Sequence, residues 1–322
     1  MGIIAKVGTA IQQLLIRIAV VTGAKSQVIK RKRKFTAESL VQTFVLGFLK
    51  DPAASDEALA QMAVQCGAEV TPQAIDRRHT PALVSFLEET FREGVKIVVG
   101  ADKSLAPILE RFTNVTVLDG STITLPDSMA EKFSGCGGSY DASKAAMKLQ
   151  VELDLRGGAI SHVEIEAGRS SDGATCRQHV RRGAGSLRIT DLGYFNLLVF
   201  AGMMAADEHF LSRLQFGTTV LLQNGEAVDL LPWLAKQRGP FVDQPVLLGK
   251  EQRLKCRLIA WRLPQEQADR RRQKLRQETK RKNGGTPSAD RLAWCDWTIL
   301  VTSVPEDMMT PKEATVLYRA RW

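Results

Sequence analysis

The chain has 322 residues, enough for two or three domains, and its 44% hydrophobic and 25% charged residues are ordinary for a soluble globular protein. Its 44 Lys and Arg against 35 Asp and Glu give a net charge of +9, which favours a polyanionic partner, nucleic acid first and an anionic membrane surface second. The five cysteines form no CxxC pair, which argues against a disulfide framework or a zinc site.

The sequence predicts neither a membrane span nor a signal peptide. Its longest uncharged run, residues 192–206, has 15 residues, whereas a membrane-spanning helix needs about 20. The N-terminal apolar stretch is interrupted by Gln12, Gln13 and Arg17, and no small-residue cleavage site follows it. We therefore expect a cytoplasmic protein whose cysteines are free thiols.

A dense basic cluster marks the start of the chain. Residues 1–34 hold eight basic residues and no acid, and five of these cations are consecutive: Lys30, Arg31, Lys32, Arg33 and Lys34. Adjacent like charges repel one another, so their clustering favours an anionic partner such as DNA. A solvated turn between two helices explains the same pattern, and both interpretations stay open.

Helices are predicted for residues 36–93. Thr71-Pro72 starts one of them, because threonine caps helices and proline fits their first position. A short helix, a glycine-containing turn and a second helix with Arg77 and Arg78 near its start resemble a helix–turn–helix that contacts DNA. Such helix pairs also occur in bundles that bind no DNA, so both alternatives remain.

Two aspartates each follow a predicted β-strand. Residues 115–118 form a β-rich run that ends at Asp119, and residues 187–190 predict a second strand that ends at Asp191. We expect these strands to be neighbours in one sheet, so that both carboxylates offer hard oxygen ligands to Mg²⁺ or Mn²⁺. Phosphodiester chemistry uses two such ions about 3.5–4 Å apart and needs a third carboxylate. For either aspartate alone, a helix cap or a turn is an equally ordinary role.

The segments around these strands predict a mixed α/β sheet. Residues 146–155 and 160–165 alternate between apolar and polar side chains on either side of a glycine-rich turn, which is typical of a β-hairpin. A short helix is expected at residues 176–180, and a strongly apolar helix at residues 194–206. Strands and helices in this order indicate a sheet with helices packed on it.

The chain returns to short β-runs after residue 210, with a basic helix among them. Strands are expected at residues 210–214, 218–222, 246–248, 254–261 and 297–302. The helix, residues 265–282, carries eight cations against three acids, and these cations are Arg270, Arg271, Arg272, Lys274, Arg276, Lys280, Arg281 and Lys282. So uneven a charge favours contact with phosphates over a helix that is merely solvated.

Three blocks of the sequence resemble those of the insertion-sequence-4 family of DDE transposases. The first is VLDGSTITLP at residues 117–126, and the second is ITDLGYF at residues 189–195, followed by FLSR at residues 210–213. The third, YRARW at residues 318–322, is similar to the start of the family's tyrosine–arginine–glutamate–lysine block. The resemblance covers nearly the whole chain, and the three blocks in this order are far more specific than any one of them.

The resemblance implies a ribonuclease H-like α/β fold, with a mixed sheet that has helices on both faces. A helical, basic region that binds DNA, residues 1–110, would precede the first part of the catalytic core, residues 111–209. A β-rich insertion with the basic helix would then cover residues 210–304, and residues 305–322 would begin the C-terminal catalytic helix.

The resemblance also implies which residues perform catalysis. Asp119 and Asp191 match the two metal-binding aspartates, and Tyr318 and Arg321 match the tyrosine and arginine of the third block. The family uses two Mg²⁺ ions, for which Mn²⁺ can substitute. The catalytic glutamate would fall at position 325 and the lysine at position 332, beyond Trp322. We therefore expect the chain as given to have weak or no strand-transfer activity.

The function that the resemblance implies is cut-and-paste transposition of an insertion sequence, through phosphodiester hydrolysis and strand transfer. The expected partners are double-stranded DNA, as inverted-repeat ends and as target, and a second copy of the chain in a homodimer within the bacterial nucleoid. Neither a membrane nor a small-molecule cofactor is expected. An alternative is a catalytically dead transposase fragment that acts only as a sequence-specific DNA-binding protein or inhibitor. A nuclease of the same fold is disfavoured, because a simple nuclease needs neither the insertion nor the third block.

Overall fold

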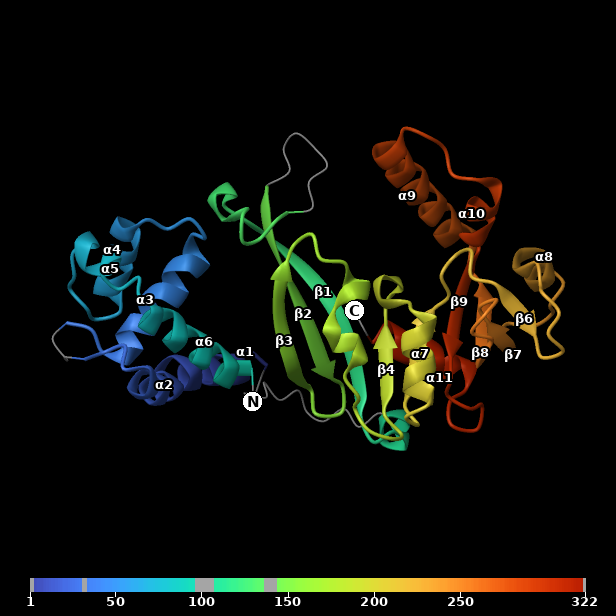
Figure 1. Ribbon diagram of the computed structural model, residues 1–322, viewed down its shortest axis with the longest axis horizontal. Helices are drawn as coiled ribbons and strands as arrows, with labels where there is room; N and C mark the ends of the chain where they lie inside the picture. Colours follow the sequence, from blue (N-terminus) through green and yellow to red (C-terminus); the bar gives the residue numbers. More distant parts are fainter. Residues whose placement is uncertain (1–2, 31–33, 96–106, 136–143, 321–322) are drawn as a thin grey trace.

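The computed structural model describes residues 3–30, 34–95, 107–135 and 144–320 (Figure 1). Four residues predicted to bind DNA or act in catalysis lie outside this part of the chain: Arg31, Lys32, Arg33 and Arg321. The backbone of Lys282 is described, but its side chain is not. Cys136 also lies outside the described residues, and the four described cysteines are free thiols, as predicted.

The N-terminal region is a helical bundle, as predicted, and lies at one end of the molecule (Figure 1). Its elements are α1 (Ile3–Gln12), the π-helical segment η1 (Gln13–Ile18), α2 (Ala19–Ser26), α3 (Ala37–Lys50), α4 (Asp56–Gln65), α5 (Pro72–Asp76) and α6 (Pro81–Val95). Helix α3 begins where the side chain of Thr36 accepts a hydrogen bond from the backbone of Ser39, because the first amide groups of a helix have no partner within it. Leu40, Phe44 and Phe86 are buried in the core of this bundle.

The described residues form a nine-stranded sheet in the order β3-β2-β1-β4-β5-β9-β8-β7-β6. Its strands are β1 (Val115–Leu125), β2 (Ala145–Asp154), β3 (Ala159–Ala167), β4 (Leu187–Thr190), β5 (His209–Arg213), β6 (Val220–Leu222), β7 (Val242–Leu248), β8 (Leu254–Arg262) and β9 (Trp297–Thr302). Strand β4 lies parallel to β1 and to β5, and the other neighbours are antiparallel. This arrangement confirms the predicted mixed α/β fold.

The prediction that a strand ends at Asp119 is wrong. Strand β1 continues beyond Asp119 as far as Leu125. The reason is the hairpin partner, because β2 still pairs with this part of β1, starting with Gly120 opposite Gln150. The β-rich run of the sequence ends before Asp119, but pairing with β2 keeps the backbone extended beyond it.

The apolar helix expected at residues 194–206 is shorter than predicted. The chain first forms the 3₁₀ segment η6 (Leu192–Tyr194), and α7 (Leu197–Met204) starts only after Asn196. The side chain of Asn196 accepts hydrogen bonds from the first backbone amides of α7, which fixes the start of the helix. An interior asparagine in an apolar run was therefore a helix cap.

Helices cover both faces of the sheet. On one face, Phe200 of α7 stacks on Phe210 of β5 with ring centroids 4.2 Å apart. On the other face, α11 (Pro311–Arg319) and the 3₁₀ segment η2 (Pro107–Arg111) belong to the same hydrophobic cluster as Leu211 of β5. Phe210 and Leu211 serve two different cores because successive residues of a strand point to opposite faces.

The segment after β5 extends the same sheet. Its helices are α8 (Leu230–Ala235), α9 (Gln265–Asn283) and α10 (Ala289–Trp294). Strand β9 pairs with β5 on one side and with β8 on the other, so this β-rich segment continues the sheet instead of forming a second one. The domain boundaries at residues 110, 209 and 304 stay predictions.

No helix in the described part of the chain combines the length and the apolar character that crossing a membrane requires.

Candidate functional site

Asp119 and Asp191 are neighbours at the point where two parallel strands separate. In the register between β1 and β4, Leu118 pairs with Thr190, and the next residue of each segment is an aspartate. Neighbouring strands lie about 4.8 Å apart, and matching positions present their side chains on the same face. Both aspartates are half-buried. The sheet thus brings together two residues that lie far apart in the sequence.

The two carboxylates lie where β1 and the chain after β4 diverge. Strand β1 continues beyond Asp119, whereas the chain after Asp191 leaves the sheet in η6 and enters α7. Carboxylates placed in this way can supply oxygen ligands to a hard divalent cation. Within the described residues, no group of three or more His, Cys, Asp or Glu side chains is arranged to hold a metal ion. The aspartate pair therefore fits one part of a metal site.

Tyr318 reaches this pair from the opposite end of the described chain. Its hydroxyl donates a hydrogen bond to Oδ1 of Asp191, with 3.1 Å between the two oxygens. The tyrosine lies in α11 and is 8% exposed, because its ring packs in the core between that helix and the sheet. A side chain held by packing is a suitable anchor for one orientation of the Asp191 carboxylate.

The start of α11 is also fixed. Thr310 and Glu313 form a capping box, and Glu313 accepts hydrogen bonds from both terminal nitrogens of Arg111 at 3.1 and 2.7 Å. These hydrogen bonds lower the pKa of Glu313 to about 2, the one from Arg111 being the largest cause. Helix α11 is therefore tied to η2, the segment that leads into β1.

A cavity of about 220 Å³ opens beside Asp191 and Tyr318. Three arginines from three different elements line it: Arg213 from β5, Arg271 from α9 and Arg319 from α11. Burial, and then the positive charge of Arg213, lower the pKa of Arg271. Converging cations next to a carboxylate pair suit a phosphodiester held against the aspartates. The sequence did not single out Arg213 and Arg319, although both lie within blocks that carry the resemblance.

A second group of polar side chains lies next to Asp119. Tyr194 is 1% exposed and its hydroxyl donates a hydrogen bond to Oε1 of Gln150 at 2.6 Å. Burial, followed by the negative charges of Asp172 and Asp119, raises the pKa of Tyr194 well above its usual value, so the phenol is neutral. Lys148 forms an ion pair with Asp172 at 2.9 Å. The sequence did not predict these contacts near Asp119, because each of them joins distant parts of the chain. The residues that make them are Tyr194, Gln150, Lys148 and Asp172.

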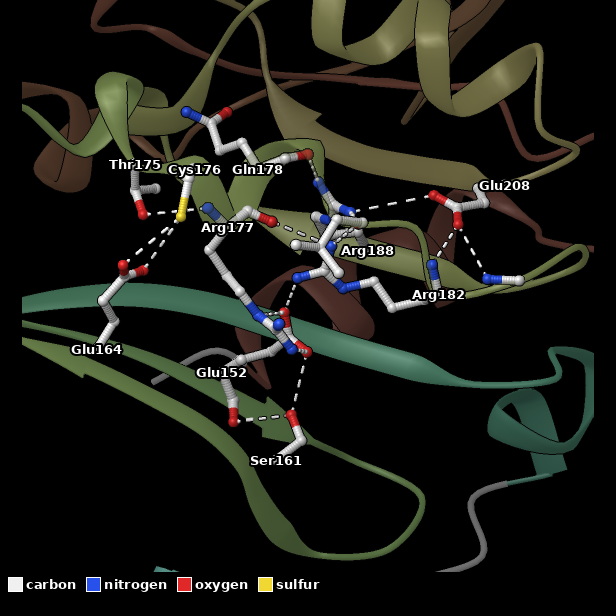
Figure 2. Close-up of polar contacts among 12 residues, drawn as sticks. Glu152, Ser161, Glu164, Thr175, Cys176, Arg177, Gln178, Arg182, Arg188 and Glu208 are labelled. Carbon is white, nitrogen blue, oxygen red and sulfur yellow. Dashed lines mark hydrogen bonds and ion pairs between the residues drawn. The ribbon is translucent and has the colours of Figure 1, made fainter. Parts of the chain in front are cut away.

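Buried arginines fasten the segment between β3 and β4 (Figure 2). Arg188 of β4 is 2% exposed and donates to the carbonyl oxygens of Gln178 and Val180 at 2.6 and 2.8 Å. Arg177 and Arg182 both pair with the buried carboxylate of Glu152. Burial lowers the pKa of Arg188 to about 10 and that of Arg182 to about 9.

Glu208 completes this arrangement at the start of β5. It is 1% exposed and accepts a hydrogen bond from the backbone nitrogen of Gly183 at 2.9 Å. It lies 4.0 Å from a terminal nitrogen of Arg188. We call the set of Arg177, Arg182, Arg188, Glu152 and Glu208 the interior arginine cluster.

The described DNA-binding candidates of the N-terminal region are Lys34, Arg77 and Arg78, and they belong to the bundle at one end of the molecule (Figure 1). Lys34 and Arg77 are exposed. Arg78 contacts its own bundle instead, because it donates to the carbonyl oxygen of Val28 at 3.1 Å and lies over the ring of Phe35. The N-terminal bundle lies at one end of the molecule, whereas α9 stands beside β9 in the other half of the sheet (Figure 1).

The cations of α9 divide into two sets. Arg271 donates to the carbonyl oxygen of Trp297 at 3.1 Å, and Arg272 pairs with Asp296, so both hold the helix to the sheet. Arg270 is exposed and pairs with Glu266. The other described cations of this helix point to solvent, and they are Lys274, Arg276, Lys280 and Arg281.

Comparison with known proteins supports a common origin with transposases. Residues 110–322 match the model of the protein family described as the transposase DDE domain. The chain is 26% identical over 319 residues to the transposase for insertion sequence element IS231B of Bacillus thuringiensis subsp. berliner, a match that covers 91% of the chain and 65% of the relative. It is 23% identical over 323 residues to the transposase for insertion sequence element IS1151 of Clostridium perfringens, with 92% and 67% covered. The chain thus spans about two thirds of the length of these relatives.

Proposed function

Because the chain belongs to the transposase DDE domain family, we propose that it acts as the transposase of an insertion sequence, which hydrolyses phosphodiester bonds of DNA and transfers strands. The observation that carries this proposal is the register of β1 and β4, which sets Asp119 beside Asp191. The hydrogen bond from Tyr318 to Asp191 supports it further, since the tyrosine belongs to the third block of the resemblance.

Divalent metal ions are part of the chemistry that the family implies. Asp119 and Asp191 would hold Mg²⁺, with Mn²⁺ as a substitute, because carboxylate oxygens are the ligands that both ions prefer. When bound, such ions activate the attacking oxygen and stabilise the leaving oxygen. Tyr318 would keep one orientation of the Asp191 carboxylate ready for this task.

The protein's own cations would bind the DNA. In the cavity beside Asp191, Arg213, Arg271 and Arg319 would contact the oxygens of the phosphodiester, and the exposed cations of α9 would contact the adjoining duplex. The proposal includes inverted-repeat ends and target DNA as substrates, a homodimer on paired ends, and action at the bacterial nucleoid. The names of the relatives, transposases for insertion sequence elements, support DNA as the partner.

Nicking of a supercoiled plasmid that carries the element's own ends tests this proposal. With Mn²⁺, we expect slow nicking by the chain and a loss of more than about 100-fold in Asp119→Asn and Asp191→Asn, since even outer partners of a metal site contribute about 10–100-fold. Asp243→Asn is the control, because Asp243 forms an ion pair with Arg257 in β7 and β8, away from the aspartates. Equal nicking by all four proteins would contradict the proposal. Tight DNA binding without nicking by any of them would favour the DNA-binding or inhibitory alternative.

A further inference from the structure

We propose that Asp172 is a positioning residue of the metal site, and that its carboxylate braces the two backbone segments that carry Asp119 and Asp191. This inference rests on the proposed function, since it assigns a role in metal binding. Asp172 begins the 3₁₀ segment η4 (Asp172–Ala174), which follows β3 and precedes η5 (Cys176–His179). No pattern in the sequence singles out this aspartate.

The two oxygens of Asp172 face Gly120, directly after Asp119, and Gly193, two residues after Asp191. A Cβ atom added to Gly120 would lie 2.8 Å from Oδ1 of Asp172, and one added to Gly193 would lie 2.6 Å from Oδ2. Real Cβ atoms essentially never come this close, so a side chain at either position would push the Asp172 carboxylate out of its place. Asp172 is therefore wedged between the segment after Asp119 and the segment after Asp191.

The carboxylate is held in this place from the side of β2. The side-chain nitrogen of Lys148 lies 2.9 Å from Oδ1 of Asp172 and also donates to the carbonyl oxygen of Ser170. The lysine side chain is only 12% exposed, and salt screens a partly buried ion pair much less than a surface pair. Lys148 stands opposite Thr122 in the pairing of β2 with β1, the strand that contains Asp119.

The backbone of Asp172 is fixed from the side of β4. The side-chain nitrogen of Gln178 donates to the carbonyl oxygen of Asp172 at 3.2 Å, and Gln178 is 1% exposed. The carbonyl oxygen of Gln178 in turn accepts a hydrogen bond from Arg188 of β4 (Figure 2). A chain of contacts therefore runs from β4, whose end precedes Asp191, to the carboxylate that rests on Gly193.

Tyr194 closes the space on the remaining side. A Cβ atom at Gly120 would lie 3.1 Å from the hydroxyl oxygen of Tyr194, which is itself bonded to Gln150 of β2. Because Lys148 pairs with Oδ1 and Oδ2 lies against Gly193, both oxygens of Asp172 are engaged, and we assign this carboxylate to positioning the backbone and not to binding the metal as a further ligand. Partners that orient metal ligands contribute about 10–100-fold to metal affinity.

Titration of the full chain with Mn²⁺, followed by the electron paramagnetic resonance signal of the free ion, tests this role. We expect Asp119→Asn to remove the binding that the aspartate pair provides. Asp172→Asn, Asp172→Glu and Gly193→Ala should each weaken it about 10-fold. Asp172→Glu keeps the negative charge but is too long for the space between the glycines, and Gly193→Ala changes no charge. These two variants therefore separate positioning from simple electrostatic attraction.

Two control variants carry the same substitutions, Asp to Asn and Gly to Ala, at positions away from Asp172. Asp243→Asn removes a carboxylate from an ion pair elsewhere, and Gly285→Ala adds a methyl group where no atom lies within 4 Å. Both should bind Mn²⁺ as the wild type does, at a temperature where circular dichroism shows every variant folded. If Asp172→Glu and Gly193→Ala also match the wild type while Asp119→Asn has lost binding, the inference is overturned and the proposed metal site stands. If the wild type binds no better than Asp119→Asn, both are overturned.

Discussion

Two arginine-rich regions of this molecule use the same side chain for opposite purposes. In the interior arginine cluster, Arg188 is 2% exposed, and its charge is met by backbone carbonyls and by the nearby carboxylate of Glu208. In α9, Arg276 and Arg281 are exposed, and the helix carries few acids. A buried guanidinium needs partners at all times, whereas an exposed one is free to exchange water and counterions for phosphates.

A count of cations therefore does not identify a DNA-binding surface. Even within α9, Arg271 and Arg272 hold the helix to the backbone of Trp297 and to Asp296, while Lys274 and Lys280 point away. Arg78, predicted to contact DNA, likewise contacts Val28 and Phe35. Burial and partners divide the cations into those that stabilise the fold and those that can bind a ligand.

The largest expected effect is on stability, from the interior cluster. Arg188→Met removes the donor to Gln178 and Val180 and leaves the buried carboxylate of Glu208 without its nearby cation. We expect the free energy of unfolding in urea to fall by about 3–5 kcal/mol, as when one partner of a buried charge pair is removed. Arg276→Met, the same change on the exposed face of α9, should stay within about 0.5 kcal/mol of the wild type. Similar decreases in both variants would contradict this division between buried and exposed arginines.

The second-largest expected effect is a loss of DNA affinity when the exposed cations of α9 are removed. The fourfold variant that changes Lys274, Arg276, Lys280 and Arg281 to Gln should bind duplex DNA more weakly. The slope of log K against log salt should become shallower by about 0.9 for each phosphate that these side chains neutralise in the wild type. Unfolding in urea should be unchanged, because these side chains are exposed.

A fourfold variant of equal composition is the control. It changes the exposed residues Lys236, Arg238, Lys250 and Arg253 to Gln, which alters the net charge equally but lies outside α9. We expect it to keep most of the affinity and of the salt slope. An equal decrease of affinity in both variants, measured by fluorescence anisotropy, would mean that net charge and not the α9 surface governs binding.

The smallest effect concerns the pH dependence of stability at the start of α11. The pKa of Glu313 lies near 2 in the folded chain, below its usual value of 4.5, because of the hydrogen bonds from Arg111 and from Thr310. A carboxylate with a lowered pKa stabilises the folded chain at pH values above its pKa in the unfolded chain. This stabilisation is lost as the pH falls from about 4.5 towards 2. Glu313→Gln should therefore lower the free energy of unfolding at pH 6 by no more than about 1 kcal/mol, since the pair is partly exposed.

The difference between Glu313→Gln and the wild type should disappear on approaching pH 2, as measured by urea unfolding at a series of pH values. Glu306→Gln removes an exposed acid just before α11 and should follow the wild-type curve. A pH-independent difference for Glu313→Gln would show that the charge on this residue is not what ties α11 to η2.

Much of the fold could be predicted from local patterns. The alternation in residues 146–155 and 160–165 predicted the β2–β3 hairpin, because side chains of a strand point to opposite faces by geometry alone. The mixed α/β fold and the transposase family are confirmed. The end of β1 was wrong, since its length depends on pairing with β2, and pairing is invisible to a local pattern.

Only part of the candidate site could be predicted from the sequence. Asp119 and Asp191 stood out because each follows a predicted strand, and the β1–β4 register makes them neighbours. Asp172 and Lys148 did not stand out, because a lone aspartate in a polar loop and a lysine in an alternating strand are ordinary in sequence. Their importance arises only from the glycines and the backbone that they meet.

The sequence by itself determined which chemical groups are present and the positions of many strands and helices, because periodicity, capping and charge are local properties of the chain. It also determined the family, through three short blocks. Only the tertiary structure decided which cations are buried among carbonyls and which face solvent, and which carboxylate rests between Gly120 and Gly193. These are long-range contacts. Burial determines how strongly each charge interacts with its neighbours, and it exists only once the sheet has assembled.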